Sequence, residues 1–162
     1  MVPIVAPNHV VHAERPSDAT ASLVRSMRRI AQSIDVRSRE IARQSGLTLP
    51  QLIVLQSVHS LGEVTTQAIS RDAAMSAPTV VGVLEKLEAK GMVERYRSTR
   101  DRRVVHSRLT DLGRAALYNS PDLLSSKFIT AFSHLPSTRR VEIAQALDAL
   151  ADMMGHPSGS LL

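Results

Sequence analysis

Arginines are concentrated in one short stretch of this chain. Six of its 17 arginines lie between positions 95 and 108, where Asp101 is the only acidic residue. The stretch has a net charge of +5, the same as the formal charge of all 162 residues, so the rest of the chain is close to neutral. Guanidinium groups match phosphate in a bidentate geometry, and so local a cluster favours a phosphate-binding surface. The alternative is a solvated charged face without a ligand. Asp101 is expected to pair with a neighbouring arginine and fix the loop.

A second group of candidate residues lies on a helix predicted over residues 76–90. Ser76 is a good N-cap and Pro78 fits the first turn. Apolar residues at helical spacing give this helix a buried stripe, and its other side begins with small and polar side chains. The candidates on that side are Ser76, Ala77, Pro78, Thr79, Gly82 and Lys86. The face contains no Arg, Asn or Gln, so an ordinary amphipathic helix with a solvated side is the competing interpretation.

The surrounding pattern predicts the elements that position both groups. Residues 48–110 are expected to form three helices, with N-caps at Thr48, at Thr65 or Thr66, and at Ser76. A hairpin with strands over 92–98 and 103–109 follows, and Thr110 is expected to cap the next helix. Three helices and a basic hairpin form a winged helix-turn-helix, whose second motif helix enters the major groove of DNA. We therefore predict that helix 76–90 lies in the major groove and that the wing over 95–108 contacts phosphates and the minor groove. The predicted wing contacts are Arg97, Arg100, Asp101, Arg102, Arg103 and His106.

The two ends of the chain are expected to serve dimerisation. Long helices are predicted from Asp18 and from Ser137 or Thr138, and both have apolar seams. A small wing domain cannot cover two such seams, so we expect a homodimer, unless both stripes pack within one subunit. The seam residues are Leu23, Met27, Ile30, Ile34, Ile143, Leu147, Leu150 and Met154.

The predicted domain organisation follows from these elements. The fold class is mainly α with a small β-wing, in the order α-α-α-α-β-β-α-α. Residues 18–47 and 111–154 are assigned to the helical dimerisation region, and 48–110 to the DNA-binding domain. Residues 1–17 are predicted to be a flexible arm and 155–162 a flexible tail. The helix that follows the wing is expected to be broken or kinked near 119–121, with Ser120 as a new N-cap.

Several classes of protein are disfavoured by composition. The absence of cysteine excludes disulfides, thiolate zinc sites and a cysteine nucleophile. Four aromatic residues cannot build the stacking platforms of single-strand binders. No histidine cluster, phosphate loop or nucleophile elbow is visible, so we expect no enzyme, no metal and no cofactor. No apolar run is long enough to span a membrane and the start does not read as a signal peptide, so the expected location is cytoplasmic.

The wing and its flanks resemble those of MarR-type transcriptional regulators. The matching motifs are Gly91-Met92-Val93-Glu94-Arg95, Asp101-Arg102-Arg103 and Leu109-Thr110-Asp111-Leu112-Gly113. The resemblance implies a homodimeric repressor on a palindromic operator, and it implies that Asp101 and Arg103 matter for DNA binding. This sequence departs from the family at Gly82, where a polar or basic side chain is more common.

The resemblance also implies a small-molecule effector between the dimer and wing regions. By analogy, the lining residues would include Arg29, Ser33, His59 and Tyr118, although each of them also fits a surface or packing role. A weaker likeness over residues 34–52 concerns a subgroup that regulates ectoine synthesis. Two other functions stay open: a low-specificity architectural or anti-silencing DNA-binding protein, and a winged-helix adaptor for proteins. The charge of the wing argues against the adaptor.

Overall fold

The computed structural model describes residues 18–155, so the predicted arm 1–17 and nearly all of the predicted tail 155–162 lie outside the described residues. The chain divides into two compact units, Met1–Asp35 and Val36–Leu162. The boundary lies within the first helix, α1 (Asp18–Ser45), which begins at the predicted residue. Our assignment of 48–110 to DNA binding and of 18–47 and 111–154 to dimerisation stays a prediction.

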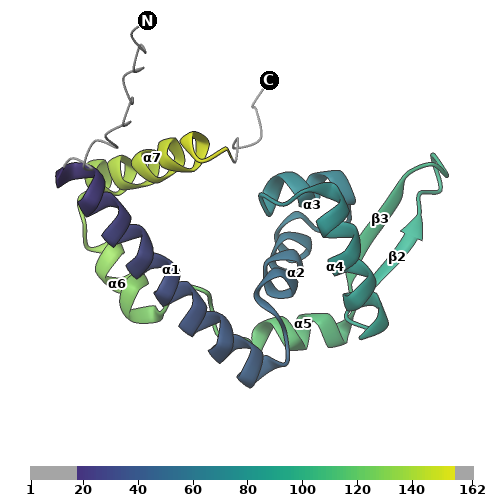
Figure 1. The fold of residues 1–162 in the computed structure, drawn as a ribbon. Coiled ribbons are helices and arrows are strands. Elements are labelled where there is room, and N and C mark those ends of the chain that lie inside the picture. The colour runs from purple at the N-terminus through teal and green to yellow at the C-terminus, as the bar shows by residue number, and fades with distance from the viewer. Residues whose placement is uncertain (1–17, 156–162) are drawn as a thin grey trace, which may run out of the picture. The chain divides into compact units, whose positions relative to one another are not determined.

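The second unit contains the predicted winged helix-turn-helix, shown in Figure 1. Its elements are the end of α1, α2 (Leu49–Leu61), β1 (Val64–Thr65), α3 (Thr66–Asp72), α4 (Ala77–Ala89), β2 (Val93–Arg97), β3 (Val105–Leu109), α5 (Asp111–Tyr118), α6 (Ser126–Ser133) and α7 (Ser137–Met153). The mainly helical fold with a small β-wing is confirmed. The two-residue strand β1 was not predicted, because a strand that short has no periodicity.

The strands form an antiparallel sheet in the order β1-β3-β2. The hairpin pairs Val93 with Leu109 and Arg97 with Val105, and β1 adds to the free edge of β3. Helix α4 ends at Ala89, shortly before β2 begins at Val93. The chain reverses between them at Gly91, whose φ is 69°. The hairpin therefore extends beside α4, and its turn projects from the unit (Figure 1).

Side-chain caps determine where several helices begin. The hydroxyls of Thr65, Ser76 and Thr110 accept backbone N–H groups of the first turns of α3, α4 and α5, as typical N-caps do. Gln51 Oε1 accepts the Thr48 N–H at 3.1 Å at the start of α2. The predicted starts of these helices are therefore confirmed.

The predicted break after α5 is confirmed, but the predicted cap at Ser120 is wrong. Helix α5 ends at Tyr118, and α6 begins at Ser126 with Ser125 as its N-cap. The Ser120 hydroxyl instead donates to the Ala116 carbonyl at 2.7 Å, so it completes the end of α5. The last helix begins at Ser137, and Pro136 rather than Ser137 or Thr138 occupies its N-cap position.

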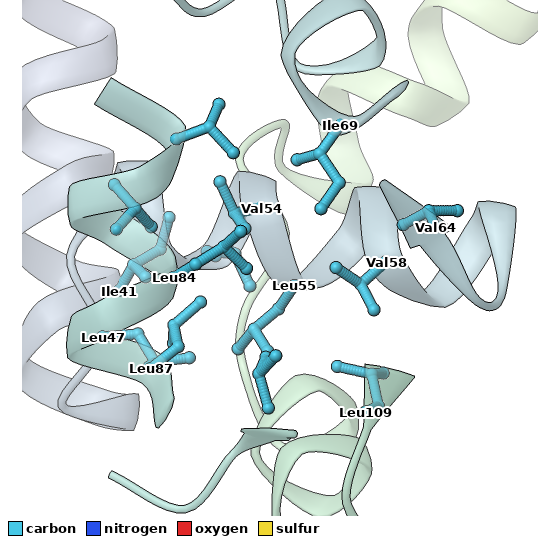
Figure 2. Close-up of a cluster of buried hydrophobic side chains, with 14 residues drawn as sticks. Ile41, Leu47, Val54, Leu55, Val58, Val64, Ile69, Leu84, Leu87 and Leu109 are labelled. Atoms are coloured by element: carbon cyan, nitrogen blue, oxygen red, sulfur yellow. The ribbon is translucent and has the colours of Figure 1, made fainter. Parts of the chain in front are cut away.

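A single apolar cluster holds the elements of the winged helix-turn-helix in place. It contains the buried side of α2, Ile69 of α3, the inner stripe of α4 and residues of all three strands. Figure 2 shows Leu84 and Leu87 of α4 in one cluster with Ile41 and Leu47. Burying a leucine or isoleucine of this kind stabilises the fold by roughly 1.5–3 kcal/mol. This packing leaves the opposite side of α4 exposed.

Candidate nucleic-acid interface

The turn of the wing is held by its own side chains. Ser98 Oγ accepts the backbone N–H groups of Arg100 and Asp101 at 3.2 and 3.4 Å. Asp101 Oδ1 accepts the N–H of Arg103 at 2.9 Å. Asp101 thus fixes the loop as predicted, but through a backbone N–H rather than a guanidinium group. This role of Ser98 was not predicted from the sequence, although a serine three residues before an aspartate is a recognisable turn signal.

Among the described residues, carboxylates pair with only two of the six wing arginines. Arg95 lies 4.0 Å from Glu88 of α4. Arg108 lies 3.0 Å from Glu94 and 3.7 Å from Glu63. These pairs join the base of the hairpin to its surroundings. The positive charge at the base is therefore offset locally.

The arginines at the distal end of the wing are not paired with carboxylates in the described part of the chain. Arg97 donates to the Arg102 carbonyl at 3.0 Å, a contact that orients the guanidinium without neutralising it. Arg100, Arg102 and Arg103 are exposed, and within residues 18–155 their guanidinium groups have no partner. A rigid turn that presents uncompensated arginines can bind the phosphates of a nucleic acid.

His106 lies at the base of the wing and packs against an aromatic ring. Its ring stacks on Tyr96 with centroids 5.7 Å apart and an interplanar angle of 24°. Its Nδ1 is buried without a hydrogen-bond partner in the described part of the chain. The predicted phosphate contact of His106 stays a prediction, and it would have to use the other ring nitrogen.

Two groups beside His106 have shifted pKa values. A hydrogen bond to Glu63 raises the pKa of Tyr96, and burial raises it further. A hydrogen bond to Glu94 raises the pKa of the Arg108 guanidinium. Arg108 also lies 5.0 Å from the centroid of the Tyr96 ring, within the range of a cation–π contact. These side chains form one connected polar cluster on the sheet.

The exposed side of α4 carries the residues predicted from the sequence. Ser76, Ala77, Pro78, Thr79 and Lys86 are exposed. Gly82 is half-buried, and a Cβ built on it would meet nothing within 4 Å. The stripe formed by Val80, Val83, Leu84 and Leu87 is buried, as the amphipathic pattern predicted. The structure thus brings these candidate residues to one free helix face.

A contact that the sequence did not predict fixes the other end of α4. Lys90 Nζ donates to the Gly46 carbonyl at 2.9 Å and to Gln51 Oε1 at 3.1 Å. The exposed Lys90 side chain thus joins the C-terminus of α4 to the junction of α1 and α2, where the dipole of α1 favours a cation.

The predicted dimerisation residues remain largely uncovered in the single chain. Leu23, Ile30 and Ile34 of α1 are exposed, as are Leu147 and Met154. Met27, Ile143 and Leu150 are half-buried. Phe128 and Ile129 of α6 lie within the predicted dimerisation region 111–154, although they are not among its predicted seam residues, and they add exposed apolar area.

Two of the predicted effector residues share a cavity. His59 and Tyr118 line a space of about 630 Å³ together with Gln56, Arg114 and Asp122, among others. His59 and Arg114 also line a smaller cavity of about 250 Å³. Arg29 and Ser33 belong to the other unit, where the Ser33 hydroxyl donates to the Arg29 carbonyl at 2.9 Å.

The described part of the chain has neither a metal-binding cluster nor a membrane-spanning helix. Residues 18–155 hold no group of three or more His, Asp or Glu side chains that could bind a metal ion. None of the helices in the same range is both long and apolar enough to cross a membrane.

The sequence is similar to known regulators. Residues 47–105 match the model of the MarR family. The uncharacterized HTH-type transcriptional regulator YsmB of Bacillus subtilis is 31% identical over 99 residues, which cover 61% of this chain and 68% of that protein. The HTH-type transcriptional repressor MdtR of the same organism is 31% identical over 88 residues, covering 54% of this chain and 57% of MdtR.

Solved structures share the fold. A MepR-like protein superposes with a TM-score of 0.67 and 21% identity, covering 85% of this chain and 97% of that one. BpsR of Bordetella bronchiseptica, whose DNA binding is regulated by 6-hydroxynicotinic acid, superposes with a TM-score of 0.62 and 25% identity. That match covers 80% of this chain and 98% of BpsR.

Proposed function

This chain belongs to the MarR family of transcriptional regulators, and from that premise we propose that it is a homodimeric, sequence-specific repressor that binds a palindromic operator in double-stranded DNA. It is a transcriptional regulator rather than an enzyme, as its relatives are. In the proposed complex, α4 lies in the major groove and the wing contacts phosphates and the minor groove.

The absence, among the described residues, of carboxylate partners for the arginines at the tip of the wing is the observation that carries this proposal. Arg100, Arg102 and Arg103 have no carboxylate partner in the described structure, whereas Arg95 and Arg108 at the base of the wing do. A solvated charged face would need no fixed turn. Here Ser98 and Asp101 hold the backbone of the turn, so the guanidinium groups are presented from a pre-organised loop, which lowers the entropic cost of binding.

The apolar residues left exposed on α1, α6 and α7 support dimerisation. Leu147 of α7 is 49% exposed and Phe128 of α6 is 48% exposed, which is unusual for large apolar side chains that recur along helices. A second copy of the chain would remove this surface from water. Two recognition helices related by a two-fold axis would then lie about 34 Å apart, or a multiple of that distance.

A small-molecule effector belongs to the proposal. The cavity lined by His59 and Tyr118 offers a polar and partly aromatic site beside α2 and α5. The DNA binding of BpsR is regulated by a small aromatic acid. An effector would release the repressor by changing the separation of the two recognition helices, which is measurable by distance labelling of α4 with and without ligand.

Binding to the DNA upstream of the protein's own gene tests the proposal. At fixed salt, that duplex should compete much better than a random duplex of equal length. Equal competition by the two duplexes would instead support the low-specificity architectural alternative. No binding to either duplex would support the protein adaptor. Sedimentation should give twice the mass of one 17.7 kDa chain, and a substitution such as Leu147→Glu should reduce the mass to that of one chain.

A further inference from the structure

Ser76 and Thr79, at the N-terminus of α4, bind each other. Ser76 Oγ lies 2.7 Å from Thr79 Oγ1 and also accepts the Thr79 backbone N–H at 3.3 Å. The contact between the hydroxyls uses one of their two hydrogens, and the backbone N–H uses a further acceptor site. The pair keeps one hydroxyl hydrogen and two acceptor sites, but it is oriented by its internal contact and offers no bidentate donor to the edge of a base. The Thr79 methyl group is its apolar part.

The groups that this end of the helix presents outward are apolar. Ala77 contributes a methyl group and Pro78 a ring, and both residues are exposed, as is Thr79. One turn further along, Gly82 has no side chain and leaves open space beside it. No side chain with a guanidinium or amide group lies on this part of the helix. It therefore lacks the bidentate side chains that distinguish guanine and adenine in the major groove.

The major groove contains one apolar group of its own, the C5-methyl of thymine. From this match, which rests on the function proposed above, we propose that Ala77, Pro78 and Thr79 read thymine C5-methyl groups, so that each operator half-site is selected for thymines beneath the start of α4. The occupant of this apolar face is double-stranded DNA rather than a protein, because Lys86 on the same face and the unpaired wing arginines offer a positive surface. Affinity then comes chiefly from phosphates, and base choice comes from methyl contacts.

Replacing thymine with deoxyuridine tests this inference directly. Uracil lacks the C5-methyl group but keeps the pairing edge and the minor-groove edge of thymine, so wing contacts are preserved. The duplex used is the strongest-binding fragment of the upstream DNA, with single thymines replaced inside and outside the half-sites. Each contacted methyl that is removed should weaken binding by about fourfold, as expected for burying one methyl-sized group. Replacements outside the half-sites should have no effect.

Variants of the protein complete the test. Thr79→Ser removes the methyl but keeps the hydroxyl that bonds Ser76, so the fold is preserved and the preference for thymine over uracil should fall at one position. Ala77→Gly should do the same at another position. The matched control is Lys86→Ala, which should weaken binding to the thymine and uracil duplexes by the same factor.

Three results would overturn the inference, and they are distinguishable. Specific binding to the upstream DNA with equal affinity for thymine and uracil duplexes would reject methyl reading and leave the proposed function intact. Failure to prefer the upstream DNA over random DNA would reject both. A preference for thymine that Thr79→Ser and Ala77→Gly leave unchanged would also reject the assignment to these residues.

Discussion

Gly113 of α5 lies directly against the backbone carbonyl of Met92, and a Cβ built on Gly113 would overlap that carbonyl. The Met92 oxygen also accepts the Thr110 N–H at 3.1 Å, and Thr110 Oγ1 donates to the Gly91 carbonyl at 2.7 Å. The start of α5 is thus bound to the chain reversal that separates α4 from the wing. This close approach explains why the Leu-Thr-x-x-Gly motif needs a glycine at its last position.

Gly113→Ala is therefore expected to destabilise the protein by about 2–3 kcal/mol or more, because the obstacle is backbone rather than a movable side chain. Gly82→Ala is the matched control, since the same change in α4 meets open space. That substitution should stabilise the fold by roughly 0.5–1 kcal/mol through helix propensity. Urea unfolding at one protomer concentration measures both, and equal effects would contradict the role of Met92.

Ala74 adopts a left-handed backbone conformation, with a φ of 50°, in the turn between α3 and α4. For a residue with a Cβ this conformation costs roughly 1–2 kcal/mol. We expect Ala74→Gly to raise stability by about 0.5–1 kcal/mol after the larger chain entropy of glycine is subtracted. Ala73→Gly, at a right-handed neighbour with a φ of −79°, should instead lower stability. Thermal unfolding of the two variants distinguishes them by the sign of the change.

Arg103→Ala should weaken DNA binding broadly across sequences, because it removes a guanidinium group from a phosphate. The slope of log affinity against log salt should become shallower by about 0.9 for each phosphate that the protein no longer neutralises. Arg139→Ala, in α7 and paired with Glu142 at 2.9 Å, should leave that slope unchanged. Titrations at several salt concentrations measure the slope. A slope that Arg103→Ala leaves unchanged would show that this arginine does not bind a phosphate.

Lys90→Met keeps the aliphatic stem of the side chain but removes the ammonium that bonds Gly46 and Gln51. We expect a loss of about 1 kcal/mol in stability, with the salt slope of DNA binding unchanged. Lys86→Met should behave in the opposite way, since the Lys86 side chain is exposed and its ammonium group has no partner within residues 18–155. The stability of the Lys86→Met variant should change by less than about 0.5 kcal/mol, while its affinity for DNA should fall. Stability and affinity measured on both variants separate a supporting lysine from one that binds DNA.

The phenol of Tyr96 is expected to ionise above its ordinary pKa of 10.0, because Glu63 accepts its hydrogen bond. A raised pKa means that the folded state favours the neutral phenol. This stabilisation is complete below pH 10 and is lost as the pH rises through the folded-state pKa. In a Tyr118→Phe background, the tyrosinate absorbance reports Tyr96 alone. Adding Glu63→Gln should move that transition to lower pH, and an unmoved transition would contradict the bond.

Local sequence was sufficient to predict most helix boundaries. Thr65, Ser76 and Thr110 were identifiable as caps because a capping hydroxyl bonds an N–H only three residues away. The restart of α6 was mispredicted because Ser120 and Ser125 both satisfy that rule. The choice between them depends on the bond from Ser120 to Ala116, which ends the preceding helix.

The sequence by itself determined the family, the buried stripe of α4 and the stretch in which positive charge is concentrated, since all three follow from residue type and short spacing. Only the tertiary structure decided which of those charges are free. Glu63, Glu88 and Glu94 come from a loop, a helix and a strand, and chain reversal brings them to Arg95 and Arg108 at the base of the wing. Charge pairing depends on distance in space, so a charge count along the chain could locate the cluster but could not distinguish its neutralised base from its available tip.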